Sequence, residues 1–359
     1  MSAFSPDTAP KKKPFSLQLD PSLFEPASAA EKEQHDVMRE STTFFRDGMR
    51  RLVRNPLAML SIAVLLILLV TILIAPMIVP YGYSEVIRVG GQRDRTTNNM
   101  RPFQYSEKEQ EIIDAGGKVF PHIFGTDELG RDYFIRVVFG ARVSLAVGFF
   151  ASIIVLIIGL LYGSISGYVG GKTDIIMMRV VDIIYSLPDT LMVVMLSVVL
   201  DQVLGNALQG TILQSIGNNM LSMFVVFGLL YWVGMARLVR GQILQIKNNE
   251  YVLAARALGA GAGRIIRKHI LPNCMSVIII ATALQIPSAI FVESFLSFIG
   301  LGVQAPMPSL GSLANLARGG MQIYPYKMLF PALGICLIVL SFNLLGDGLR
   351  DAFDPKLRR

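Results

Sequence analysis

The residues "SGYVGGKT" at 166–173 come close to the pattern of a phosphate-binding loop. Such a loop has a glycine, four further residues and then Gly-Lys-Ser/Thr, and it lies between a strand and a helix. Gly171, Lys172 and Thr173 fit, but Ser166 stands where the first glycine belongs. Because the flanking segments are long apolar runs, we interpret these residues as a short polar turn between two membrane spans.

Histidine and cysteine are too scattered to suggest a metal or redox centre. The three histidines, His35, His122 and His269, lie far apart in the sequence, and both cysteines, Cys274 and Cys336, sit in apolar runs. We therefore expect no metal site, no disulfide framework and no catalytic residue in this chain.

The composition is that of a membrane protein. The chain has 359 residues, of which 52% are hydrophobic and 16% charged, and its mean hydropathy is +0.52. A membrane-spanning helix needs about 20 mostly apolar residues. Six segments meet this requirement, which predicts an all-α, polytopic membrane protein with spans at 57–79, 143–165, 175–200, 220–236, 274–292 and 328–346. The first span starts too late and is too long for a signal peptide.

The distribution of basic residues predicts the orientation. Residues 237–268 carry seven Lys or Arg and a single acidic residue, Glu250, whereas 201–219 has no basic residue. Basic short loops stay in the cytoplasm. We therefore expect 237–268 and both termini to be cytoplasmic and 80–142 to lie outside. The net charge of +7 is explained by this orientation, and a nucleic-acid partner is not needed.

The segments around the spans have their own patterns. Residues 1–44 resemble a disordered cytoplasmic tail, and 45–56 form an amphipathic pattern suited to a helix in the membrane interface. The outer loop 80–142 ends in a second amphipathic stretch, in which Tyr133, Phe134, Val137 and Val138 share a face and favour interfacial anchoring. The core follows at 143–349, and 350–359 form a cytoplasmic C-terminus.

Four charged residues fall inside or at the ends of predicted spans. Charges in a membrane usually face a bundle interior or a water-filled path. Arg179 and Asp182 are three residues apart, so we expect a structural ion pair. Asp189 beside Pro188 and Glu293 beyond Pro287 are candidates for lining a translocation path.

The basic segment 240–273 is more structured than a simple connection. Tyr251, Ala254, Ala255 and Leu258 recur at helical spacing and predict a short helix with one small, apolar face. Gly259 permits a turn, and a second helical stretch runs to the next span. This pattern indicates a docking surface for a soluble partner.

The same segment resembles a known family. Ala254, Ala255, Gly259, His269, Leu271 and Pro272 are spaced as in the "EAA" loop of permease subunits of ATP-binding-cassette importers, although Leu253 occupies the usual glutamate position. The stretches "FGTDELGRD", "GARVSL", "FLSFIGLGVQAPMPSLG", "YPY" and "FNLLGDGLRDAFDPKLR" resemble the C-type permease of oligopeptide, dipeptide and nickel importers.

The resemblance implies a six-helix subunit with the type I importer permease fold. It further implies a pore shared with a second, related permease, two cytoplasmic ATPase subunits, an extracytoplasmic substrate-binding lipoprotein and a peptide substrate. ATP and Mg²⁺ would then be bound by the ATPase subunits, with no cofactor in this chain. Two alternatives are open: nickel as the substrate of the same family, and a proton-coupled secondary transporter.

Overall fold

The fold is described from a computed structural model that covers residues 44–207, 218–303 and 307–353. The chain divides into two units, Met1–Arg46 and Asp47–Arg359, and the second contains every contact discussed below. Residues 1–43 of the predicted tail 1–44 and most of the predicted C-terminus 350–359 lie outside the described residues, so both predictions stay open.

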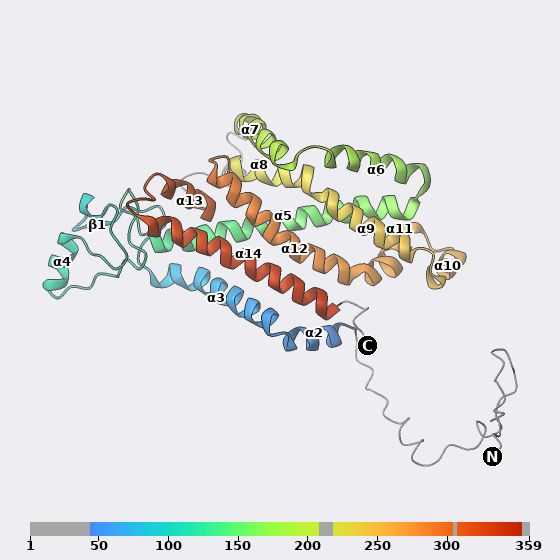
Figure 1. Ribbon diagram of the computed structural model, residues 1–359, viewed down its shortest axis with the longest axis horizontal. Helices are drawn as coiled ribbons and strands as arrows, with labels where there is room; N and C mark the ends of the chain where they lie inside the picture. The colour runs from blue at the N-terminus through green and yellow to red at the C-terminus, as the bar shows by residue number, and fades with distance from the viewer. Residues whose placement is uncertain (1–43, 208–217, 304–306, 354–359) are drawn as a thin grey trace, which may run out of the picture. The chain divides into compact units, whose positions relative to one another are not determined.

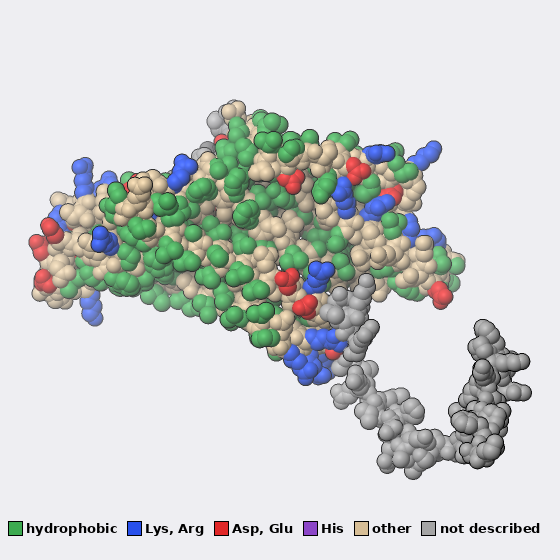
Figure 2. Space-filling view, viewed as in Figure 1, with side chains coloured by type: hydrophobic (Ala, Val, Ile, Leu, Met, Phe, Trp, Pro, Cys, Tyr) green, Lys and Arg blue, Asp and Glu red, His purple; other side chains and the backbone are tan. Residues whose placement is uncertain are grey.

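Helices that could cross a membrane make up most of the second unit (Figure 1). In the described ranges, five are long and apolar enough: α3 (Pro56–Ile78), α5 (Tyr133–Val169), α8 to α9 (Met220–Ile246), α11 to α12 (Ala262–Phe298) and α14 (Pro325–Phe353). Hydrophobic side chains cover much of their surface, whereas charged side chains gather mainly towards the helix ends (Figure 2). Five of the six predicted spans therefore correspond to helices that are long and apolar enough to cross a membrane.

The remaining predicted span, 175–200, is not one straight helix. The chain forms α6 (Gly171–Tyr185) and α7 (Asp189–Ala207), which are bent by 86° relative to each other. Pro188 lacks a backbone N–H and disfavours helical geometry at the residue before it. The Ser186 hydroxyl donates to the carbonyl oxygen of Ile183 at 2.8 Å just before the break. The count of six spans therefore holds only if this bent pair is one span.

Helix α5 is the central helix of the bundle, and it packs most extensively on α9 (Trp232–Ile246) and α12 (Leu271–Phe298). Its glycines bring the helices close together. A Cβ atom on Gly163 would lie 2.4 Å from the carbonyl oxygen of Ala236, and one on Gly148 would lie 2.4 Å from Cγ1 of Ile290. Small residues allow such close backbone contact between membrane helices, where packing is a main source of association.

The amphipathic segment before the first span forms α2 (Phe44–Arg54), so the predicted helix is confirmed. Leu52 is buried against Ala58, Ala352 and Phe353, whereas Met49 and Val53 are exposed. Asn55 then caps α3 by accepting hydrogen bonds from the backbone N–H groups of the next turn. The apolar face is thus divided between a contact with α14 and an exposed strip.

The second amphipathic stretch is not a separate interfacial helix, so this prediction is wrong. Tyr133, Val137 and Val138 are buried in the first turns of α5, where they pack against α13 (Leu310–Arg318) and α14. Their apolar spacing was recognised, but the helix continues without interruption into the predicted span at 143–165. The face therefore belongs to the core of the bundle.

Residues 79–132, here called the loop domain, connect α3 to α5. They contain a two-stranded hairpin, a short 3₁₀ helix and one α-helix: β1 (Arg88–Val89), β2 (Gln92–Arg93), η2 (Arg95–Thr97) and α4 (Glu107–Asp114). Ser106 and Glu109 form a capping box at the start of α4. Many of the buried side chains here are polar, in contrast to the helical bundle.

A buried histidine holds this loop domain together. His122 is fully buried, with Nδ1 2.9 Å from Oδ2 of Asp132 and Nε2 3.1 Å from Oε1 of Glu109. Asp132 also caps α5 by accepting from the N–H of Ile135 at 3.0 Å. Burial alone would lower the pKa of His122, but the bonds to Asp132 and Glu109 outweigh it and raise this pKa to about 9. An imidazolium between two carboxylates therefore links α4 to the start of α5.

We predict that the loop domain loses stability at alkaline pH. The folded-state pKa of His122 lies above its ordinary value of 6.5, so the stabilisation is complete below pH 6.5 and is lost as the pH rises through about 9. The shift corresponds to roughly 3 kcal/mol. Hydrogen exchange of residues 79–132 between pH 6.5 and 10, corrected for intrinsic rates, should show protection factors falling by roughly 100-fold.

The variant His122→Gln provides the control, since glutamine can donate to one carboxylate but does not titrate. Its loop domain should be less protected at pH 6.5 and should show no further loss of protection towards pH 10. Tyr81 and Tyr105, whose rings lie 5.0 and 6.4 Å from that of His122, stay unchanged in this variant. Protection in the wild type that does not vary with pH would show that His122 is not charged in the fold.

Candidate functional site

The segment between α9 and α12 projects from one end of the helical bundle as a short helix, α10 (Glu250–Ala257) (Figure 1). Val252 anchors this helix, because its side chain is fully buried beside Ile265 and Ile270. Tyr251 is 42% exposed and Leu258, which follows the helix, is 89% exposed. The predicted helix is confirmed, and it is held by its inner face with an apolar residue at its tip.

The predicted apolar face is exposed at three of its four positions. Tyr251, Ala254 and Leu258 are exposed, but Ala255 is half-buried and packs with the cluster around Val252. Leu253, at the position of the family's glutamate, is 45% exposed. Together with Tyr251 and Leu258, this leucine gives α10 several exposed apolar side chains, so the helix is suited to contact with another surface.

Gly259 makes the turn after α10, as predicted. Its φ of +80° lies in the left-handed region, which side chains rarely adopt. Space does not require glycine here, since an added Cβ would meet nothing within 4 Å. The backbone N–H groups of Leu258 and Ala260 donate to the carbonyl oxygens of Ala254 and Ala255, which closes the end of the helix.

The chain then returns to the bundle through α11 (Ala262–Ile265) and a π-helical turn, η5 (Ile266–Ile270). The carbonyl oxygen of His269 accepts a hydrogen bond from Nδ2 of Asn273 at 2.7 Å, and Leu271 is half-buried. Pro272 lies in the first turn of α12, where its missing N–H costs little. The second predicted helical stretch is confirmed, and it runs directly into the span.

The ion pair predicted within α6 has a different partner. The Arg237 guanidinium of α9 donates to Oδ1 of Asp182 at 2.7 Å, so Arg179 is the wrong partner. A second pair, which the sequence analysis missed, joins Asp174 of α6 to Arg240 of α9. Spacing along one helix cannot reveal a partner that lies on another helix.

Glu293 does not line an open path in this chain, contrary to the prediction. It is fully buried, and its carboxyl group accepts hydrogen bonds from the hydroxyls of Ser144 and Ser297 at 2.7 Å and of Ser294 at 3.3 Å. Ser144 also receives the N–H of Leu310 at 3.4 Å. Glu293 therefore joins α5, α12 and the start of α13 from the inside.

Asp189, the other candidate for the path, is exposed at the first residue of α7, directly after the bend. Its position allows contact with a transported molecule, but nothing in the structure tests this role, which stays a prediction. Among the described residues, no group of three or more His, Cys, Asp or Glu side chains could hold a metal ion.

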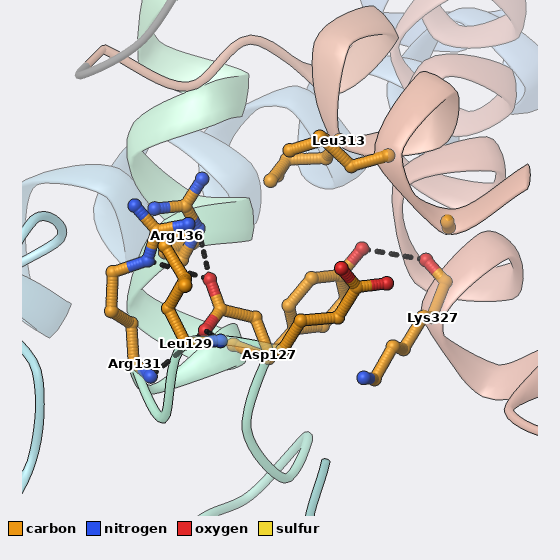
Figure 3. Close-up of a pocket in the computed structure, with 10 residues that line it drawn as sticks. Asp127, Leu129, Arg131, Arg136, Leu313 and Lys327 are labelled. Atoms are coloured by element: carbon orange, nitrogen blue, oxygen red, sulfur yellow. Dashed lines mark hydrogen bonds and ion pairs between the residues drawn. The ribbon is translucent and has the colours of Figure 1, made fainter. Parts of the chain in front are cut away.

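A pocket of about 190 Å³ lies where the loop domain meets α13 and α14 (Figure 3). This is the end of the bundle opposite α10 (Figure 1). Asp127 accepts from Nε of Arg131 at 2.6 Å and lies 3.4 Å from Nε of Arg136, and Arg136 donates to the carbonyl oxygen of Tyr83. Across the pocket, the ammonium group of Lys327 donates to Oδ1 of Asn99. These basic groups thus have partners within the chain and fasten the loop domain to the bundle.

Comparison with known proteins places this arrangement in a family. The model for the binding-protein-dependent transport system inner membrane component matches residues 156–359, and that for the N-terminal TM domain of oligopeptide transport permease C matches residues 43–102. The first match includes α10, Gly259 and both ion pairs between α6 and α9.

Curated relatives match nearly the whole chain. The oligopeptide transport system permease protein OppC of Bacillus subtilis is 40% identical, covering 94% of this chain and 98% of the relative. The dipeptide transport system permease protein DppC of the same organism is 43% identical, covering 91% of each. OppC of Haemophilus influenzae is 38% identical, covering 90% of this chain and 92% of the relative. The chain therefore belongs to the family of binding-protein-dependent transport system inner membrane components.

Proposed function

We propose that this chain is the permease subunit of an ATP-binding-cassette importer that carries oligopeptides or dipeptides and forms half of the translocation pore. The relatives that match most of its length are named as oligopeptide and dipeptide transport permeases, which favours peptides over nickel. The pore would be completed by a second, related permease. A proton-coupled secondary transporter would have no use for the projecting α10.

The orientation follows from the basic residues around α10. Arg256, Arg264, Arg267 and Lys268 are exposed in the segment between α9 and α12, so this end of the bundle belongs in the cytoplasm. Both termini then lie on the cytoplasmic side, and the loop domain lies outside. An extracytoplasmic substrate-binding lipoprotein would meet the loop domain and the nearby start of α14.

The observation that carries the proposal is the exposed tip of α10. Leu258 is 89% exposed, while Val252 on the other side of the helix is fully buried. A helix that is anchored on one face and apolar on the other fits into a groove on a partner. We assign this groove to one of two ATPase subunits, which bind ATP and Mg²⁺, and this chain itself would hold no cofactor.

Coupling of the pore to ATP hydrolysis requires that the ATPase subunit bind α10 tightly. Moving a two-state pore from 1:99 to 99:1 takes about 5.5 kcal/mol of differential binding. Burying Leu258 in a groove would contribute about 2 kcal/mol of docking affinity, with more from Tyr251, Leu253 and the small surface at Ala254. Binding that is equal in both states shifts no equilibrium, so the differential would come from closure of the ATPase pair, and these side chains would keep α10 attached while that pair moves.

We predict that Leu258→Asp releases the ATPase subunit that docks on α10 without unfolding the permease. Because Leu258 makes little contact with its own chain, the change should leave expression and thermal stability unaltered. Purification of the C-terminally tagged chain in mild detergent should recover the second permease, with recovery of that ATPase subunit reduced by at least about tenfold. Mass spectrometry of the purified complex provides the measurement.

Ile323→Asp is the matched control, since Ile323 is 72% exposed at the other end of the bundle. This substitution should leave ATPase recovery unchanged. Equal recovery of ATPase subunits with Leu258→Asp and the wild type would rule out α10 as the docking helix. Recovery of the chain alone, with peptide uptake driven by a proton gradient, would instead rule out the importer.

We further predict different effects of replacing Glu293 and Asp189, the two acidic residues that the sequence predicted to line the translocation path. Glu293→Ala should lower the thermal stability of the permease and its yield, because three buried serine hydroxyls lose their acceptor. A cost of about 3 kcal/mol is expected for breaking such a network. Asp189→Ala should leave stability and assembly intact and change peptide uptake.

Thermal unfolding of the purified complexes and uptake into proteoliposomes separate these effects. Glu293→Gln tests the network, because an amide can still accept from the serines and should recover most of the stability. If Glu293→Ala were as stable as the wild type but inactive, Glu293 would belong to the path after all. If Asp189→Ala transported at the wild-type rate, Asp189 would have no part in it.

A further inference from the structure

The turn at residues 166–173 has no assigned part in transport, yet it organises a polar cluster. Helix α5 ends at Val169, and Gly170 and Gly171 have φ values of +70° and +58°. This left-handed pair reverses the chain, so that α6 starts beside the end of α5. The Ser166 hydroxyl donates to Oδ1 of Asp174 at 2.5 Å across the turn.

Asp174 is also bound by the neighbouring helix. Arg240 of α9 donates from Nε to Oδ1 at 2.5 Å and from Nη2 to Oδ2 at 2.6 Å. The side chain of Asp174 is 14% exposed and that of Arg240 is 32% exposed. A two-point pair of this kind fixes distance and orientation at once, and partial burial strengthens it.

Two further contacts connect the same turn to the segment that carries α10. The ammonium group of Lys247, which follows α9, donates to the carbonyl oxygen of Gly167 at 2.9 Å. The Arg256 guanidinium of α10 lies 5.6 Å from the ring centre of Tyr168. The turn at 166–173 and its Asp174 neighbour are therefore in contact with Arg240 of α9, with Lys247 after α9 and with Arg256 of α10.

Helix α6 depends on these contacts for its position. Its only fully buried side chain in the described structure is that of Val181, and most of its apolar residues face outward. In a bilayer, lipid chains solvate such residues about as well as protein does, so apolar contacts alone would place α6 weakly. The polar links to α9 are specific, because lipid chains cannot replace them.

We propose that Asp174 and Arg240 are positioning residues that make α6 move together with α9 when α10 is displaced. This inference rests on the proposed function, because it takes α10 as the helix that the ATPase moves. The bend at residues 186–188 separates α6 from α7, so a movement of α6 changes the angle at this bend. Asp189 starts α7 at that point, and the pair thereby connects ATP-driven movement to the predicted path.

The test is the ratio of peptide uptake to ATP hydrolysis in the assembled importer. The complex of both permeases and the ATPase subunits is reconstituted in proteoliposomes with its binding protein, and both rates are measured with a tripeptide. Asp174→Asn and Arg240→Ala should retain subunit assembly and ATP hydrolysis but lower the ratio by about tenfold, a typical size for coupling between sites. The charge swap, Asp174→Arg with Arg240→Asp, should recover part of the ratio.

Asp182→Asn is the matched control. Asp182 and Arg237 join the same two helices, but their side chains are 56% and 37% exposed, so the ratio should change by less than about threefold. If the complex with Asp174→Asn does not assemble, two milder variants test the proposal instead. Arg240→Lys keeps the charge without the two-point geometry, and Lys247→Met removes the hydrogen bond to Gly167. Both should lower the ratio of uptake to ATP hydrolysis.

The outcomes separate this inference from the proposed function. A wild-type complex without ATP-driven uptake would refute both. A functional wild type with an unchanged ratio in Asp174→Asn, or in both milder variants, would overturn the inference alone. Uptake and ATP hydrolysis that fall together, with no recovery in the charge swap, would show a purely structural pair and would also overturn it.

Discussion

The close contact between α5 and α9 is the constraint on which the rest of the structure depends. Gly159, Gly163 and Gly167 recur every four residues along α5, and a Cβ on any of them would lie within 3.1 Å of α9. In a bilayer the helices gain little from hiding apolar surface, so this close packing must hold them. It also fixes the register of α9 on α5, and through it the height of α10 and the position of Arg240 opposite Asp174.

The loop domain is stabilised differently from the helical bundle. It is too short and irregular to bury a large apolar core, so buried polar groups that satisfy one another take that role. His122 between Glu109 and Asp132 is one such group, and the Thr126 hydroxyl, which donates to the carbonyl oxygen of Thr97 and accepts the N–H of Met100, is another. Such networks are specific but sensitive to the loss of one member.

Much of the bundle could be predicted because the relevant signals are local. Apolar length located five spans, the spacing of Tyr251 and Leu258 located α10, and the glycine at 259 located its turn. Each depends on residues within one or two helical turns. The same local pattern found the apolar face at Tyr133, although not that it belongs to a span.

The errors concern partners that are distant in sequence. Asp182 pairs with Arg237, 55 residues away, and Glu293 is covered by Ser144, 149 residues away. Residues 175–200 were predicted as one span from their apolar length, although Pro188 stands where the chain bends by 86° between α6 and α7. His122 was dismissed as isolated, although the Ser106 to Glu109 capping box marked the start of the helix that supplies one of its partners.

Helix α5 joins the two polar clusters of the molecule. It begins at Asp132, which caps it and binds His122, and it ends near Ser166, which binds Asp174. With 37 residues it is about 55 Å long and has no proline inside. The contacts of α5 with α9 near one end and with the loop domain at the other thus lie on one continuous helix. In the orientation and assembly proposed above, this one helix would extend from the side that binds the ATPase to the side where substrate arrives.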